Sequence, residues 1–144
     1  MLKQFEQIAA RGQIFPFVFV QDAVAASQTD VQLNIQEVAG GVTLAIDGIS
    51  LPWAGRVVGM SINTSAAATM GSLAVGVTLD GTEQTATTQT ITTGTAATAV
   101  FPQSSVKATA GQKLGVEITT SGTWDAVTAD LAVVVYVLMD CQGV

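Results

Sequence analysis

The chain has 144 residues, of which 49% are hydrophobic and 11% are charged. This composition excludes an intrinsically disordered chain, which has little apolar surface and many charges. The length corresponds to one domain with a single core. So few charges on so apolar a chain favour burial of its surface within an assembly.

The formal net charge is −6, and the cations are scattered along the chain at Lys3, Arg11, Arg56, Lys107 and Lys113. Because nucleic acid is bound mainly through clustered Lys and Arg, we expect no direct contact with DNA or RNA. No stretch approaches the roughly 20 apolar residues of a membrane helix, so we also expect no membrane partner. The apolar run 14–20 is a poor secretory signal, because it contains Pro16 and follows acidic Glu6.

The sequence contains no histidine and a single cysteine, Cys141. A Ser–His–Asp triad is therefore impossible, and the commonest metal ligand is missing. The nearest approaches to an acid pair are Asp125 with Asp130 and Asp80 with Glu83, and each pair adjoins a turn. Carboxylates at turns usually cap backbone amides, and calcium requires several oxygen ligands close together. We therefore predict no catalytic residue, no metal site and no cofactor, and hence no enzyme.

Residues 1–12 are predicted to form a short N-terminal arm. Leu2, Phe5 and Ile8 recur at helical spacing, and Gly12 is a plausible end of the helix. A helix this short is marginal by itself. We expect the arm to dock on a neighbouring subunit, with packing against its own domain as the alternative.

Residues 13–144 are predicted to form the domain itself, and the first strands alternate in character. Residues 15–20 form a strand whose Pro16 indicates an edge position, because proline cannot donate to a ladder. Residues 31–35 form a half-buried strand, and Gly40-Gly41 turns the chain into a strand over 42–46. In the strand over 57–64, Val58, Met60 and Ile62 are expected to share one face.

The second half continues this pattern. Residues 73–79 form an apolar strand that ends at Asp80-Gly81, the strongest turn signal in the chain. A more exposed, threonine-rich strand is expected over 85–93, and an alternating strand over 114–118. Residues 131–139 are nearly continuously apolar, which is typical of a central strand covered on both faces. About eight such strands predict an all-β fold, a single jelly-roll-like antiparallel β-sandwich.

Three segments together resemble a known family: Leu51–Ser61, the hairpin over Leu73–Gly81, and Val106–Val116 followed by the strand over 131–138. Their texture is similar to that of the jelly-roll head decoration (cement) proteins of tailed bacteriophages. The resemblance implies a structural homotrimer on the outer surface of the capsid, where it stabilises the virion by bridging major capsid protein subunits. The resemblance also implies contacts through an N-terminal arm. We assign residues of the arm and, as our own expectation, of the first strand to the capsid or subunit interface: Leu2, Phe5, Ile8, Phe15, Phe17 and Phe19.

Two alternatives remain. A carbohydrate- or receptor-binding module of a phage tail fibre or baseplate would carry Trp53 or Trp124 on a loop surface, where an indole ring stacks on sugars. Packing in a core or a subunit interface is the commoner use of such tryptophans. A tail-tube component would form rings or stacks instead of separate trimers.

Overall fold

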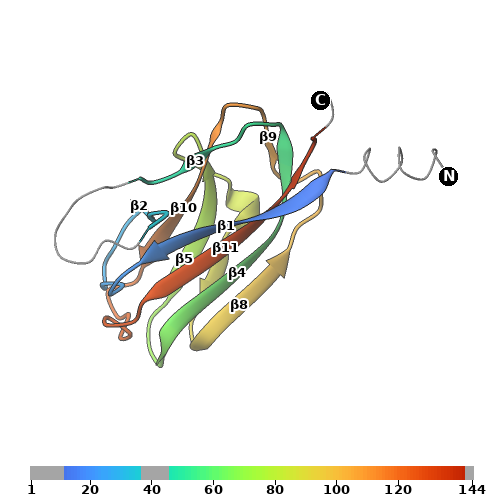
Figure 1. Ribbon diagram of the computed structural model, residues 1–144. Coiled ribbons are helices and arrows are strands. Elements are labelled where there is room, and N and C mark those ends of the chain that lie inside the picture. Colours follow the sequence, from blue (N-terminus) through green and yellow to red (C-terminus); the bar gives the residue numbers. More distant parts are fainter. Residues whose placement is uncertain (1–11, 37–45, 142–144) are drawn as a thin grey trace.

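The computed structural model describes residues 12–36 and 46–141, and the arm residues 1–11 and nearly all of the strand predicted over 42–46 lie outside these ranges. Figure 1 shows a sandwich of antiparallel strands. The strands are β1 (Gln13–Gln21), β2 (Val31–Gln32), β3 (Ile49–Ser50), β4 (Gly55–Ala68), β5 (Leu73–Leu79), β6 (Thr82–Glu83), β7 (Gln89–Ile91), β8 (Gly94–Val100), β9 (Lys107–Ala108), β10 (Lys113–Thr120) and β11 (Leu131–Met139), with a 3₁₀ turn η1 (Thr85–Thr87). Within the described ranges, no helix is long and apolar enough to span a membrane.

The strand order is that of a jelly roll. One sheet, called here the β1 sheet, has the order β1-β11-β4-β8, with β9 beside β4. The other, the β2 sheet, has the order β2-β10-β5-β6, with β3 beside β10 and β7 beside β5. The antiparallel pairs β1/β11, β2/β10, β4/β8 and β5/β7 are nested, so the chain is one long hairpin folded into two layers. The predicted all-β sandwich is confirmed.

The core between the sheets is made by alternate residues of the long strands. Leu73, Val75 and Val77 of β5 are fully buried, as the sequence predicted. Val133 and Val135 of β11, in the other sheet, are also fully buried and belong to the same core. Burying a side chain of this size stabilises the fold by roughly 1.5–3 kcal/mol. As Pro16 predicted, β1 lies at the edge of its sheet, where a missing amide is tolerated.

The predicted common face of Val58, Met60 and Ile62 is wrong, because β4 contains a bulge. Tyr136 of β11 pairs with Gly59, whereas Val137 pairs with Val57, so Val58 is an extra residue on β4. An extra residue shifts the alternation of a strand by one position. Met60 and Ile62 consequently remain in the core, while Val58 is only partly buried.

The predicted exposed strand over 85–93 is wrong in its first half. Residues 85–87 form the 3₁₀ turn η1, and Thr87 is fully buried. The Thr87 hydroxyl donates to the carbonyl of Gln84 at 2.7 Å and accepts from the amide of Val77 at 3.0 Å. Such a hydroxyl replaces a ladder partner, which explains why strand pairing resumes only at Gln89.

The predicted turn at Asp80-Gly81 is confirmed, and it joins β5 to β6. Both residues have positive φ, 51° at Asp80 and 78° at Gly81, as a type I′ hairpin turn requires. A side-chain oxygen of Asp80 also accepts the amide of Lys113 at 2.8 Å. The turn therefore fixes the register of β5 and connects it to β10.

We expect Gly81→Ala to lower the free energy of unfolding by about 1–2 kcal/mol, the cost of a left-handed conformation for an L-residue. Nothing lies within 4 Å of the added Cβ, so only the backbone contributes. Gly71 has a similar φ, 83°, but its Cβ would lie 2.4 Å from the backbone nitrogen of Trp124. Gly71→Ala should therefore cost about 3 kcal/mol or more. If urea denaturation gave the same loss in free energy of unfolding for both variants, the predicted difference between the two glycines would be contradicted.

Candidate interaction surface

The strand β11 is central in its sheet, as predicted, but only one of its faces is covered. Tyr136 is 37% exposed, and Ala132 and Val134 are partly exposed. Directly paired residues of neighbouring strands project on the same side of a sheet, so the register identifies the other residues of this side. They form the outer face of the β1 sheet: Ile14, Pro16, Val18, Val20, Arg56, Val58, Gly59, Ser61, Asn63, Ala96, Thr98, Val100, Lys107, Ala132, Val134, Tyr136 and Leu138.

Apart from Arg56 and Lys107 at one end, none of these side chains carries a formal charge at neutral pH, although the chain as a whole carries −6. Val100 is 90% exposed, Ile14 60% and Val18 48%. In Figure 1 this sheet lies toward the viewer, and no described segment crosses in front of it. A contiguous exposed apolar patch on a folded chain typically marks an interaction site.

At one end the outer face is hollowed into a groove. Two adjoining depressions, of about 830 and 450 Å³, share Ile14, Val58 and Val100 in their walls. The bulge of β4 places Val58 in the wall of both depressions. Beside it, Gly59 has no side chain to fill the smaller depression. Arg56 and Asp140 line the larger depression, where they form an ion pair at 3.2 Å. Each is more than one third exposed, so this pair contributes at most about 1 kcal/mol.

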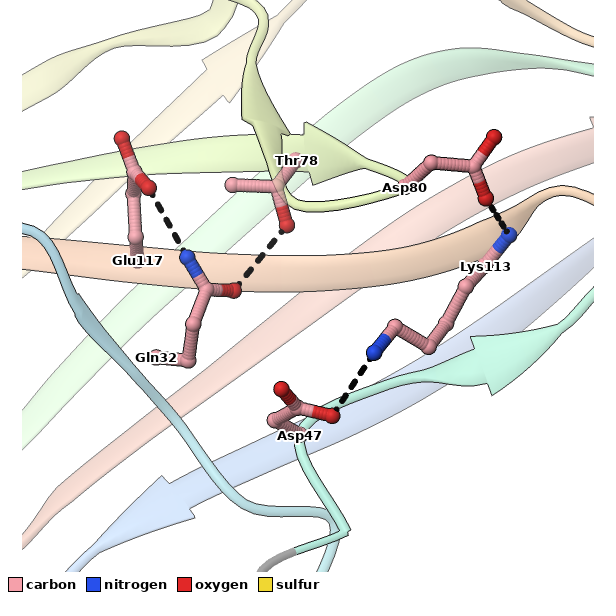
Figure 2. Close-up of polar contacts among 6 residues, drawn as sticks. All are labelled: Gln32, Asp47, Thr78, Asp80, Lys113 and Glu117. Carbon is pink, nitrogen blue, oxygen red and sulfur yellow. Dashed lines mark hydrogen bonds and ion pairs between the residues drawn. The ribbon is translucent and has the colours of Figure 1, made fainter.

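The outer side of the β2 sheet carries hydrogen-bonded polar and charged side chains, as Figure 2 shows. The Gln32 amide donates to Oε2 of Glu117 at 2.8 Å, and its oxygen accepts the hydroxyl of Thr78 at 3.1 Å. Farther along β10, Nζ of Lys113 donates to Asp47 at 2.9 Å. Polar groups on this sheet therefore already have partners within the chain.

The environment of these groups shifts two carboxyl pKa values in opposite directions. Burial raises the pKa of Glu117, which is 8% exposed, and the nearby carboxylates of Glu83 and Asp30 add to the rise. The hydrogen bond from Gln32 opposes it. For Asp47, the hydrogen bond from Lys113 lowers the pKa.

The carboxylates that the sequence suggested as acid pairs serve separate loops. Asp125 accepts the backbone amide of Thr69 at 3.0 Å, whereas the carboxylate of Asp130 accepts the backbone amide of Ala23 at 3.4 Å. Glu83 accepts the hydroxyl of Thr88 at 2.6 Å. In residues 12–36 and 46–141, no group of three or more His, Cys, Asp or Glu side chains could hold a metal ion.

The predicted interface residues of β1 point away from the outer face. Phe19 is fully buried, and Phe15 and Phe17 are partly buried against the core. Alternation in a strand then turns Ile14 and Val18 outward. The sequence contains this alternation, but it does not say which half faces the core. Leu2, Phe5 and Ile8 lie outside the described residues.

The two tryptophans have different environments. Trp124 is 2% exposed, and its indole nitrogen donates to the carbonyl of Val24 at 3.1 Å, so it is a core residue. Trp53 lies in the loop before β4 and is 39% exposed. Of the two candidates for stacking on a sugar, only Trp53 offers an accessible ring.

No protein-family model matches the chain, and no curated protein matches it. Among solved structures, the chain is similar to one from the "Cyanophage Pam1 capsid asymmetric unit", with a TM-score of 0.49 and 12% identity over 89% of this chain and 86% of that one. It is also similar to a chain of turnip yellow mosaic virus, with a TM-score of 0.36 and 16% identity over 89% of this chain and 80% of that one. The jelly-roll order of the strands stands independently of both similarities.

We expect Glu117→Gln to stabilise the protein at pH 7. A raised pKa means that the folded chain binds the proton more tightly than the unfolded chain, so the contribution of Glu117 is favourable below its ordinary pKa of 4.5 and is lost as the pH rises through the folded pKa. The advantage of the variant should therefore shrink as the pH falls toward 4.5. Urea denaturation as a function of pH measures it.

Asp47→Asn is the matched control, because the pKa of Asp47 is shifted in the direction opposite to that of Glu117. The lowered pKa of Asp47 gives stability that is present above 3.8 and is lost as the pH falls through the folded pKa. This variant should be less stable than the parent at pH 7 and equal to it in strong acid. The same pH dependence for both variants would contradict the two environments.

Proposed function

We propose that this chain is a structural virion protein without catalytic activity, a decoration protein that binds the outer surface of a tailed-phage head as a trimer and bridges major capsid protein subunits. The observation that carries the proposal is the outer face of the β1 sheet, which has no charge except Arg56 and Lys107 at one end and which exposes Ile14, Val18 and Val100. The resemblance of the sequence to decoration proteins supports the particular role.

The outer face is small enough that a single contact through it would be weak, so its size favours attachment through many repeated contacts. Four strands about 4.8 Å apart and seven residues of about 3.3 Å give an area of roughly 440 Å². At about 25 cal/mol per Å², covering it contributes on the order of 11 kcal/mol. Association itself costs about 4–15 kcal/mol, so a single contact is weak. Many copies on a symmetric shell, joined as trimers, would compensate through multivalency.

The charge of the chain fits an outer position. A net charge of −6 repels nucleic acid, so the proposed place is the exterior of the head and not its interior. Away from the end that carries Arg56 and Lys107, the outer face of the β1 sheet has no charged side chain, so contact with a shell through that part would bury no unpaired charge.

A second candidate function, a carbohydrate- or receptor-binding module of a tail fibre or baseplate, is favoured by one observation, the exposure of Trp53. Its ring is accessible in a loop, as stacking on a sugar requires. Loss of glycan binding on Trp53→Ala would support this function over attachment to a head.

We expect Val18→Lys to weaken binding to heads that lack this protein by at least tenfold, because a lysine charge would be buried at the contact. Thr82→Lys, on the exposed strand β6 of the β2 sheet, makes the same change of charge and should bind as the parent does. Binding is measured by co-sedimentation with the heads, and light scattering gives the oligomeric state.

Added to preformed heads, the parent protein should also raise their resistance to heat and to chelators. Circular dichroism and urea denaturation verify that both variants are folded. Equal binding by the two variants would contradict attachment through the outer face, and a stable monomer that leaves the heads unchanged would contradict the decoration role. Rings or stacks in light scattering would favour a tail-tube component.

A further inference from the structure

The strand β8 is the outermost strand at one edge of the β1 sheet, and its free edge has no strand partner in the described part of the chain (Figure 1). The amide of Phe101, which follows β8, donates to the carbonyl of Val58 on β4 at 2.9 Å. In an antiparallel strand, the N–H and C=O of one residue point to the same side, and successive residues alternate. Ala96, Thr98 and Val100 therefore direct their backbone groups away from β4, and no described residue forms a hydrogen bond with these groups.

The free edge of β8 lacks the features that usually prevent pairing with another chain. Natural edge strands carry charges, prolines or bulges, because unpaired ladder groups readily bind a further strand. Residues 84–106 contain no charged side chain, and Pro102 comes only after β8 has ended. The opposite edge, β1, is protected: Pro16 has no N–H, and Val20 exchanges backbone hydrogen bonds of 2.7 and 3.1 Å with Asn34. The sheet therefore has one protected edge and one that is ready to pair.

This free edge is complementary to itself. If two copies of β8 lie antiparallel with Thr98 opposite Thr98, Ala96 of each copy lies opposite Val100 of the other. Every outward N–H and C=O of these three residues then has a partner in the other copy. Their side chains are exposed and lie on the outer face, where the small Ala96 leaves room for Val100 of the second copy. No charge is brought together at the contact, because β8 carries none.

Pairing through β8 would also enlarge the outer face. A twofold axis perpendicular to the sheet leaves the outer faces of both copies on the same side of the joined sheet. Two faces of roughly 440 Å² give about 880 Å² together. A stable protein interface covers about 800 Å² on each partner. Two paired copies would thus offer a surface of the size that one copy lacks, which favours a second copy as the occupant of this edge.

We propose that two copies of this chain pair through β8, antiparallel and with Thr98 opposite Thr98, so that their β1 sheets become one continuous sheet. The inference goes beyond the proposed function, because the contact forms whether or not the chain decorates a head. A twofold contact joins two copies and cannot close a trimer. Between the proposed trimers, it would link a copy of one trimer to a copy of the next.

A proline at position 98 tests the backbone contact. Thr98→Pro removes an N–H that β4 does not use, and an edge strand tolerates proline, as β1 tolerates Pro16. Each copy loses one donated hydrogen bond, so the dissociation constant of the pair should rise at least tenfold. If the chain is also trimeric, this variant should stop at single trimers. Thr98→Val keeps the N–H and should pair as the parent does. Sedimentation equilibrium of the full-length chain measures the association, and circular dichroism verifies the fold.

A cysteine at the same position tests the register. In an antiparallel pair, opposed residues have Cα atoms about 5.5 Å apart, within the range that a disulfide spans. Thr98→Cys in the full-length chain with Cys141→Ser should therefore give covalent dimers under mild oxidation on a non-reducing gel. The matched control is Thr95→Cys, which is also exposed on β8. Its two copies would lie about 20 Å apart in the proposed register, so it should form no covalent dimer.

Absence of self-association in the folded parent, or of the covalent dimer in the folded Thr98→Cys variant, would overturn the proposal. Equal cross-linking of the two cysteine variants, or unchanged association of Thr98→Pro, would also overturn it. If Thr98→Pro weakened binding to heads while the free parent did not self-associate, the edge would instead bind a segment of another protein. Paired copies that leave heads unchanged would contradict only the decoration role.

Discussion

The alternation of side chains along β1, β11 and β4 is the constraint on which the interaction surface depends. Phe19, Val133 and Ile62 fill the space between the two sheets, and all three are buried. Once these residues face inward, the pleat forces their neighbours in sequence outward. The apolar outer face is thus a consequence of the core register, and its exposed valines cannot be turned inward without dismantling the core.

The bulge at Val58 is the one interruption of this alternation between β4 and β11. It occurs between the pairs Tyr136/Gly59 and Val137/Val57, so one valine leaves the core side and joins the outer side. Bulges commonly redirect a side chain next to a functional surface. Here the redirected valine lies between two depressions and lines both, which makes the groove apolar on its inner wall.

What the sequence predicted well was determined locally. The strand over 73–79 and the Asp80-Gly81 turn depend on near neighbours alone, and the structure has both at the predicted positions. The parity of β1, the bulge at Val58 and the buried Thr87 depend on partners that are distant in sequence or pair across strands. The sequence assigned the interface to Phe15, Phe17 and Phe19, which the structure places on the core side of β1, because aromatic residues can serve either a core or an interface.

The two outer faces differ most in what each would lose if a partner covered it. A partner on the β2 sheet would take Glu117, Asp47 and Lys113 further from water, and burial already raises the pKa of Glu117. A partner on the β1 sheet, away from Arg56 and Lys107 at one end, would remove water only from side chains that carry no charge, and dehydrating apolar surface is favourable. Desolvation therefore favours the outer face of the β1 sheet over that of the β2 sheet as the side of the molecule that a partner would cover.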